Sequence, residues 1–258
     1  MPCRIMAVTN QKGGVGKTTT TVNLATALAA SKRRVLVIDA DPQGNASTGF
    51  GLEMDDRDDD LYQLLSGQVT VEAAIHQTAI KGLMVIPSTN DLSAIEIELS
   101  HYDDREYRLK TITDALRADY DYILIDCPPS LGLLTVNALT AADSALVPLQ
   151  CEYYALEGLS QLMKTIEAVR GGLNPNLELQ GVVLTMYDQR NRLSSLVASD
   201  VRSHLGSLVY ATIIPRNVRV SEAPSYGKPV LLYDLNCPGS KAYIALAGEV
   251  IKQEGQAA

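Results

Sequence analysis

Apolar positions along the chain follow two patterns that alternate from one end to the other. Short apolar runs without polar alternation are typical of parallel strands that helices cover on both faces. Longer stretches, in which apolar residues recur every three or four positions, are typical of amphipathic helices. Strands are predicted at residues 5–8, 35–38, 83–86, 122–125, 145–147, 182–184 and 211–214. Helices are predicted at residues 18–30, 92–99, 104–116, 131–141, 156–170 and 193–205.

This alternation predicts an α/β fold, a doubly wound and mostly parallel sheet with helices on both faces. The breaks in the pattern agree with it. Pro128 and Pro129 prevent the strand at 122–125 from continuing, because proline lacks the N–H that a sheet requires. Gly171 and Gly172 are expected to end the helix that starts at residue 156.

The rest of the chain adds a last helix, expected over residues 241–251 with fraying at Gly255. The acidic run MDDRDDD at residues 54–60 is interpreted as a solvated loop. The sequence contains no internal repeat, low-complexity tract or linker. A single domain over residues 1–258 is therefore expected.

Composition supports a folded protein with an uneven charge. Of the 258 residues, 46% are hydrophobic and 20% are charged, which excludes a disordered chain. The formal net charge is −8, yet residues 186–228 contain six basic and three acidic side chains. That local excess of basic residues is interpreted either as a surface that binds a polyanion or as an ordinary solvated surface.

The cysteine and hydropathy patterns argue against a zinc-stabilised protein, a membrane-spanning protein and a secreted protein. Cys3, Cys127, Cys151 and Cys237 form no C-x-x-C pair, so a structural zinc site is not expected and the thiols are interpreted as reduced. No role is assigned to Cys127. No apolar stretch approaches the roughly 20 residues that cross a bilayer, and the first residues lack a signal-peptide core. A cytoplasmic protein without membrane contact is expected.

The strongest motif is KGGVGKTT at residues 12–19, between a predicted strand and a predicted helix. Glycines allow backbone N–H groups to turn inward around phosphate oxygens, and the helix start adds unpaired donors. Lys17 is predicted to reach the β and γ phosphates, and the Thr18 hydroxyl to ligate Mg²⁺. The predicted nucleotide-binding loop consists of Lys12, Gly13, Gly14, Val15, Gly16, Lys17, Thr18 and Thr19.

The loop departs from the general P-loop pattern in two places. Gln11 stands where the pattern has glycine, and Lys12 is a second lysine that the pattern does not require. Two ammonium groups exceed what cradling one set of phosphates needs. Lys12 is therefore a candidate ligand for phosphates that belong to another subunit.

Together with VIDADPQGN at residues 37–45 and ILIDCPPSLGLLTVNAL at residues 123–139, this loop closely resembles the ParA/Soj family of DNA-partition ATPases. That family belongs to the deviant Walker A group, which includes MinD. The resemblance implies a P-loop NTPase of the SIMIBI type over residues 1–258. It also implies no N-terminal helix-turn-helix extension, so operator binding is not expected.

The resemblance implies catalytic roles, with ATP and Mg²⁺ as cofactors. In the family the first loop lysine, here Lys12, crosses a dimer interface to the partner's ATP, and Lys17 serves its own. Asp41 orients the attacking water, although Asp41 before Pro42 is also a typical turn opener. Asp126, at the end of one predicted strand, supports Mg²⁺ through water, and Asp39, at the end of another, supports Mg²⁺ through water or else the switch loop.

Further implied sites lie in the second half of the chain. Adenine contacts fall near Met186, Pro215 and Asn217. DNA contacts without sequence preference fall on the arginines Arg190, Arg216 and Arg219. The implied protein dimerises on ATP, binds the nucleoid, and segregates chromosome or plasmid DNA with a ParB-like partner that stimulates a slow hydrolysis.

Four alternatives stay open at this point. A MinD-like membrane-cycling ATPase needs a basic amphipathic tail, whereas residues 248–258 contain one Lys and two Glu. A relative of the nitrogenase iron protein needs paired cysteines across a dimer axis. A nucleotide-binding protein without turnover, and a ParA relative that positions a protein cargo, fit the same motifs.

Overall fold

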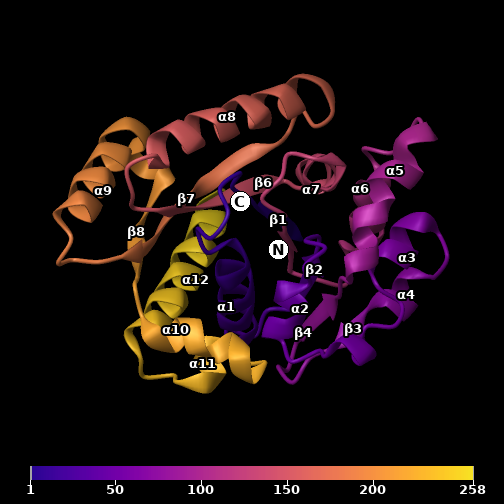
Figure 1. Cartoon of the computed structure of the whole chain (residues 1–258), viewed down its shortest axis with the longest axis horizontal. Coiled ribbons are helices and arrows are strands. Elements are labelled where there is room, and N and C mark those ends of the chain that lie inside the picture. Colours follow the sequence, from indigo (N-terminus) through magenta and orange to yellow (C-terminus); the bar gives the residue numbers. More distant parts are fainter. Residues whose placement is uncertain (1, 258) are drawn as a thin grey trace.

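The computed structural model describes residues 2–257 and contains one eight-stranded sheet (Figure 1). Its strand order is β3-β4-β2-β5-β1-β6-β7-β8. All neighbouring pairs are parallel except β3 with β4, at the edge. The strands are β1 Arg4–Val8, β2 Val35–Asp39, β3 His76–Gln77, β4 Leu83–Ile86, β5 Tyr122–Asp126, β6 Ser144–Gln150, β7 Glu178–Tyr187 and β8 Val209–Pro215.

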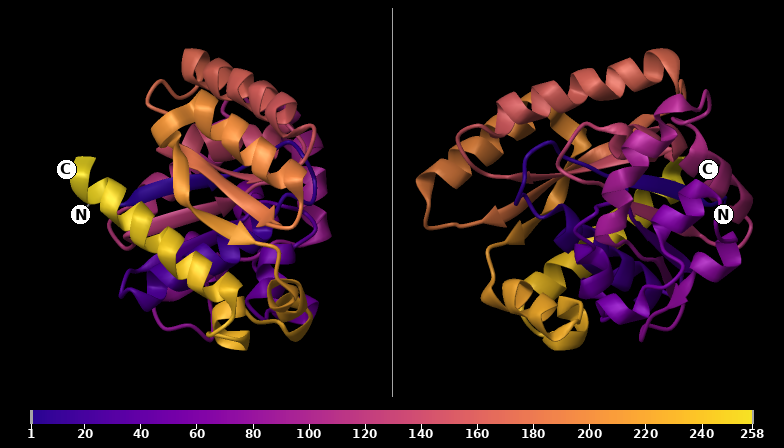
Figure 2. Two further views of the ribbon diagram at one scale, coloured as in Figure 1. Left: turned by 90° about the vertical axis from the view of Figure 1, so that its left-hand side faces the viewer. Right: turned by 45° about the vertical axis from the view of Figure 1, so that its right-hand side comes forward.

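Helices cover both faces of this sheet, as Figures 1 and 2 show. The longer helices are α1 Lys17–Ala30, α6 Arg108–Leu116, α7 Leu133–Ala141, α8 Ala155–Gly172, α9 Arg192–Leu205 and α12 Pro238–Ala257. The shorter ones are α2 Asn45–Gly49, α3 Leu61–Ser66, α4 Val71–Ala74, α5 Ile95–Glu98, α10 Val218–Glu222 and α11 Val230–Tyr233. Helices α1 and α12 pack on one face, and α6, α7, α8 and α9 pack on the other. The doubly wound α/β prediction is confirmed.

The central strands β1, β2, β5 and β6 are apolar between their end residues because both of their faces are buried. Ile123 and Ile125 of β5 belong to the core under α6 and α7, whereas Tyr122 and Leu124 belong to the core under α1 and α12. Alternate residues of a strand point to opposite faces, so a strand between two helical layers needs apolar residues throughout. Unbroken apolar runs are therefore the correct signal for this sheet.

All seven predicted strands are confirmed, and the differences lie at ends and edges. The predicted strand 182–184 is the middle of the ten-residue β7. The two-residue β3 was not predicted, because two residues carry no period. The predicted helix 92–99 is two 3₁₀ turns around the four-residue α5.

Two helix ends lie further along the chain than the predicted bounds. Helix α8 ends at Gly172, so Gly171 and Gly172 form its last turn, and the expectation that they end this helix is confirmed. The last helix starts at Pro238, where proline is favoured in the first turn, and continues through Gly255. Both expected helices thus exist, with longer bounds.

The interpretation of residues 54–60 as a solvated loop is wrong in part. Residues Met54–Asp56 form an exposed 3₁₀ turn, but Arg57 is 4% exposed and Asp60 is 2% exposed. The Arg57 guanidinium donates to the carbonyls of Leu52 and Ser88. Asp60 caps α3 by accepting a hydrogen bond from a backbone N–H of that helix. Partners outside the run therefore bind Arg57 and Asp60, while Asp55, Asp56 and Asp58 are exposed as expected.

No helix among residues 2–257 is long and apolar enough to span a membrane. The carboxyl ends of the parallel strands meet at one edge of the sheet, with the loop after β1 at its centre. In open sheets of this kind ligands bind outside the carboxyl ends of the strands.

Candidate functional site

The loop that joins β1 to α1 has the backbone geometry of a phosphate cradle. Gly14 and Gly16 have positive φ angles of 74° and 89°, which a side chain would strain. Gly16 stands at the N-cap of α1, and no side chain caps the first turn. The free N–H groups of that turn and the helix dipole therefore favour an anion at this position.

Lys17 lies inside the loop. It is 6% exposed, and its ammonium donates to the Lys12 carbonyl at 3.2 Å. Burial lowers the pKa of Lys17, while Asp126, Cys127 and Asp41 act in the opposite direction. A buried ammonium held by one neutral acceptor is well placed to exchange that acceptor for a phosphate.

Lys12 lies on the outside of the same loop. Its backbone N–H donates to the side-chain oxygen of Asn10 at 3.0 Å, and the Asn10 amide donates to the Pro148 carbonyl at 2.8 Å. The Lys12 ammonium forms an ion pair with Glu152. The two loop lysines therefore occupy different surroundings, one internal and one facing the segment after β6.

Two carboxylates meet at the carboxyl ends of neighbouring strands. Asp39 ends β2 and Asp126 ends β5, directly opposite in register, and both are fully buried. Thr21 donates its hydroxyl to Oδ1 of Asp126 at 2.9 Å, but Oδ2 of Asp126 is buried without a hydrogen-bond partner among the described residues. Burial raises the pKa of both carboxyls, and their mutual repulsion adds to the shift of Asp126.

The segment after β2 holds Asp39 in place and contains the third carboxylate, Asp41. Asp39 accepts hydrogen bonds from the Ser47 N–H at 2.8 Å and the Ser47 hydroxyl at 2.7 Å. Asp41 accepts one from the Gln43 N–H at 3.0 Å, which is the turn-opening geometry. Asp41 is 8% exposed. The turn role of Asp41 is therefore observed, and it occupies Oδ1.

The donor set fits a magnesium ion that is held mostly by phosphate and water. The described residues contain no group of three or more His, Cys, Asp or Glu side chains arranged around a metal. Mg²⁺ typically keeps several waters and takes one or two protein ligands beside phosphate oxygens. Thr18, Asp39 and the orphaned oxygen of Asp126 are the candidates for such ligands.

Three supporting side chains were not predicted from sequence. Ser47 holds Asp39, and its hydroxyl also accepts a hydrogen bond from the Ser88 N–H. Arg57 contacts the same region through Ser88 and Thr48. Thr185 donates its hydroxyl to the Val15 carbonyl at 2.8 Å and so ties β7 to the loop. These contacts span distant parts of the chain.

The residues predicted near adenine lie at the ends of β7 and β8 and at the start of α10. Met186 has a positive φ of 49°, unusual for a residue with a side chain, and its terminal carbon lies beside Gly16. Pro215 ends β8 opposite Tyr187. The Asn217 side chain caps α10 by accepting a hydrogen bond from a backbone N–H. Met186 is the one of the three that the described contacts place against the loop.

The three predicted DNA-binding arginines differ in their partners. Arg190 pairs with Asp188 at 2.9 Å, and the hydrogen bonds from Arg190 lower the pKa of Asp188 to about 2. Arg219 pairs with Glu222 at 2.9 Å and lies 3.7 Å from Asp234. Arg190 and Arg216 line one surface hollow after β7 and β8. Asp234 adds an acid that the count over residues 186–228 left out.

Comparison with known sequences assigns these features to a family. A family model described as an AAA domain matches residues 3–179. The chromosome partitioning protein ParA of Caulobacter vibrioides is 63% identical over 255 residues, covering 98% of this chain and 96% of that protein. The sporulation initiation inhibitor protein Soj of Bacillus subtilis is 53% identical over 247 residues, covering 96% of this chain and 98% of that protein.

Solved structures share the fold and include nucleotide complexes. Cobyrinic acid a,c-diamide synthase of Mycobacterium smegmatis, with bound ADP and magnesium, has a TM-score of 0.86 and 37% identity. That likeness covers 99% of this chain and 97% of that one. The septum site-determining protein MinD of Pyrococcus horikoshii, complexed with Mg-ADP, has a TM-score of 0.82 and 27% identity, covering 99% of both chains.

Proposed function

Because the chain belongs to the ParA/Soj family of chromosome-partitioning ATPases, we propose that it binds and slowly hydrolyses ATP with Mg²⁺ and pairs with a second copy when ATP is bound. One observation carries this proposal. The loop holds two lysines in different surroundings, Lys17 buried within it and Lys12 on its outer side. Only Lys17 is needed for the phosphates of its own subunit.

Phosphate binding is assigned to the backbone N–H groups of the loop and to Lys17. The positive φ angles of Gly14 and Gly16 and the uncapped start of α1 support this assignment. Thr18, Asp126 and Asp39 are the residues that would hold Mg²⁺, which supplies charge neutralisation at the β and γ phosphates when it is bound. The orphaned oxygen of Asp126 supports that role.

Hydrolysis requires a water aligned with the terminal phosphate. We assign its orientation to Asp41, which follows β2 at the carboxyl edge of the sheet. Oδ1 of Asp41 already accepts a hydrogen bond from the Gln43 N–H, so one of the two carboxylate oxygens is engaged within the turn. This supports a slow intrinsic rate, which a ParB-like partner would raise. Asp41→Ala should yield a dimer that binds ATP and keeps it.

Dimerisation through ATP can be tested directly. Purified protein with Mg²⁺ and a non-hydrolysable ATP analogue should have twice its monomer mass by light scattering, and protein with ADP should not. Lys12→Ala should bind the analogue with nearly unchanged affinity and stay monomeric, because Lys12 serves the partner's phosphates. A wild-type chain that stays monomeric at saturating analogue would refute the proposal.

DNA binding without sequence preference is assigned to the surface of Arg190, Arg216 and Arg219. A two-fold axis would double this basic surface in the dimer, and such binding weakens steeply with salt. Arg219→Glu should reduce duplex retention at low salt at least about tenfold while ATP turnover persists. Lys81→Glu, the same charge change at an exposed site elsewhere, is the control. Equal retention by both variants would place the DNA surface elsewhere.

This activity would segregate chromosome or plasmid DNA from a position on the nucleoid. ATP binding would favour the dimer, and hydrolysis would remove that preference. A ParB-like protein bound to a particular DNA site would then supply the specificity that phosphate contacts lack. Release of the duplex on adding such a protein, followed by its recovery with fresh ATP, is the expected cycle.

A further inference from the structure

The ion pair between Lys12 and Glu152 connects the loop to the segment between β6 and α8. Glu152 lies in a turn: its N–H donates to the Gln150 carbonyl at 2.9 Å, and its carbonyl accepts from the Ala155 N–H at 3.0 Å. The Lys12 side chain is 40% exposed and that of Glu152 is 33% exposed. The backbones of both residues are thus fixed, and their side chains meet at a half-covered position.

Glu152 depends on Lys12 for compensation of its charge. Its Oε1 is shielded from solvent and, within residues 2–257, accepts no hydrogen bond apart from the contact with the Lys12 ammonium. A shielded carboxylate oxygen without a cation is unfavourable. Moving Lys12 away therefore has a free-energy cost that a solvated lysine would not have.

Lys17 and Lys12 are also linked through the loop backbone. The Lys17 ammonium donates to the Lys12 carbonyl, and Asn10 accepts a hydrogen bond from the Lys12 N–H. When phosphates draw Lys17 inward, the Lys12 carbonyl loses a charged donor, whereas the pair with Glu152 is untouched. Among residues 2–257, Glu152 is then the contact that keeps the Lys12 ammonium on its own subunit, whereas Asn10 holds the Lys12 backbone.

We propose that Glu152 is a positioning residue that holds Lys12 on its own subunit, so that the triphosphate of a second subunit must compete with Glu152 for this lysine. This inference rests on the proposed function, in which Lys12 acts across a dimer. Glu152 would then determine the nucleotide and protein concentrations at which dimers form. A pair that merely ties the loop to α8 would instead support dimerisation.

The test compares Glu152→Gln with Glu157→Gln, an equal charge change at an exposed position further along α8. Dimer formation is measured by analytical ultracentrifugation across a protein dilution series, with Mg²⁺ and ATPγS. Because Glu152→Gln keeps the size of the side chain and removes its charge, the dimer should form at protein concentrations at least about fivefold lower than wild type. Glu157→Gln should match wild type.

Further measurements separate positioning from structural support. Glu152→Asp keeps a carboxylate and should stay near wild type in the dilution series. The affinity of the monomer for a fluorescent ADP analogue should be unchanged in all three variants, since Lys12 is not assigned to its own nucleotide. Thermal unfolding confirms that each variant is folded.

Two outcomes overturn the inference while leaving the proposed function intact: Glu152→Gln dimerises like Glu157→Gln, or it needs a higher protein concentration than wild type. Absence of dimers in the wild-type chain under the same conditions would instead refute the proposed function itself. A Glu152→Gln variant that forms dimers with ADP alone would support the inference most strongly. Dimerisation would then no longer need a triphosphate to displace Lys12 from Glu152.

Discussion

Two carboxylates at opposite ends of strand β5 have opposite electrostatic environments. Asp121 precedes the strand and accepts hydrogen bonds from the Arg34 N–H at 2.8 Å and its guanidinium at 3.0 Å. Partial burial acts to raise the pKa of Asp121, but these hydrogen bonds outweigh it and lower the pKa. Asp126 ends the strand, is fully buried beside Asp39, and has a raised pKa. One end of the strand is compensated within the protein, and the other is not.

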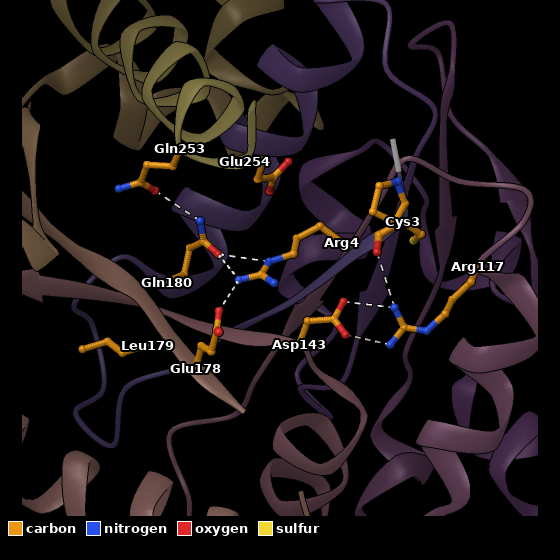
Figure 3. A pocket seen from close by; sticks show the side chains of 10 residues that line it. Cys3, Arg4, Arg117, Asp143, Glu178, Leu179, Gln180, Gln253 and Glu254 are labelled. Carbon is orange, nitrogen blue, oxygen red and sulfur yellow. Dashed lines mark hydrogen bonds and ion pairs between the residues drawn. The ribbon is translucent and has the colours of Figure 1, made fainter. Parts of the chain in front are cut away.

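The same contrast holds for the two ends of the whole sheet. At the amino end a cavity of about 600 Å³ lies between β1, β7 and α12 (Figure 3). Most of its charged groups are paired: Arg117 with Asp143 at 2.8 Å, and Arg4 with Glu178 at 3.0 Å. Glu254 accepts a hydrogen bond from the Tyr122 hydroxyl, and its other oxygen is buried without a partner among the described residues. At the carboxyl end the Lys17 ammonium has, within residues 2–257, only the Lys12 carbonyl as a hydrogen-bond acceptor. A buried ammonium without a carboxylate in ion-pair contact among the described residues, and not the size of a hollow, marks the site.

The largest expected effect comes from removing a charge at each end. Lys17→Ala should weaken ATP binding at least about 100-fold, because the phosphates lose a buried cation with charge-assisted hydrogen bonds. Arg117→Ala removes a cation of the amino-end cavity and should leave ATP affinity unchanged, while lowering the unfolding free energy by about 1 kcal/mol. Both are measured by titration with a fluorescent ATP analogue and by urea unfolding.

The Arg117→Ala variant is also the control for general damage. If it weakened ATP binding as much as Lys17→Ala does, the two ends would not be independent. If Lys17→Ala bound ATP normally, the loop would not be the phosphate site.

A smaller effect, on the free energy of unfolding, is expected from the two carboxylates at the ends of β5. It is measured without nucleotide or Mg²⁺. Because the pKa of Asp126 is higher in the folded protein, folding holds a proton that unfolding releases, and stability falls as pH rises above about 4. Asp126→Asn should therefore raise the unfolding free energy at pH 8 by about 1–2 kcal/mol and flatten its pH dependence, while ATP with Mg²⁺ binds more weakly.

Asp121→Asn should behave in the opposite way. The lowered pKa of Asp121 stabilises the folded protein above its unfolded pKa, and this contribution is lost as pH falls through the folded value. The Asn variant should be less stable than wild type at neutral pH and equal to it in acid. Urea midpoints from pH 3 to pH 8 decide both cases, and parallel curves for the two variants would contradict the comparison.

Sequence was sufficient for those features that depend on neighbours along the chain. Residues 12–19 carry their glycines, lysines and helix start within one turn, so the loop could be predicted whole. Asp39 and Asp126 could be placed together because each ends a buried strand, and the carboxyl ends of parallel strands meet at one edge. The seven main strands followed from burial on both faces.

Features that depend on contacts between distant parts of the chain could not be predicted from the sequence. Arg57 stands among acidic residues and was assigned to solvent, yet carbonyls from two other segments bury it. The pair of Lys12 with Glu152 joins positions 140 residues apart that share no pattern. Helices of four or five residues, such as α10 and α11, are too short to display a period.

The smallest effect on function is expected from the thiols, which again lie at both ends of the sheet. Burial raises the pKa of Cys3 to about 11, and burial with the charge of Asp126 raises that of Cys127 further. Because the thiolate is the nucleophile, Cys3 should react with iodoacetamide at pH 8 about 100-fold more slowly than a free cysteine, and Cys127 more slowly still. Mass spectrometry of quenched samples gives both rates.

Alkylation of Cys3 should leave ATP binding unchanged, because this residue lines the amino-end cavity, at the opposite end of β1 from the loop (Figure 3). Cys3→Ser should likewise bind ATP normally, and urea should bring both thiols of the wild type to the rate of a free cysteine. Loss of ATP binding in step with Cys3 modification would mean that the amino end communicates with the loop across the length of β1. In that case the two ends of the sheet would be coupled in function. The difference between them would then be a difference in electrostatic environment and not in function.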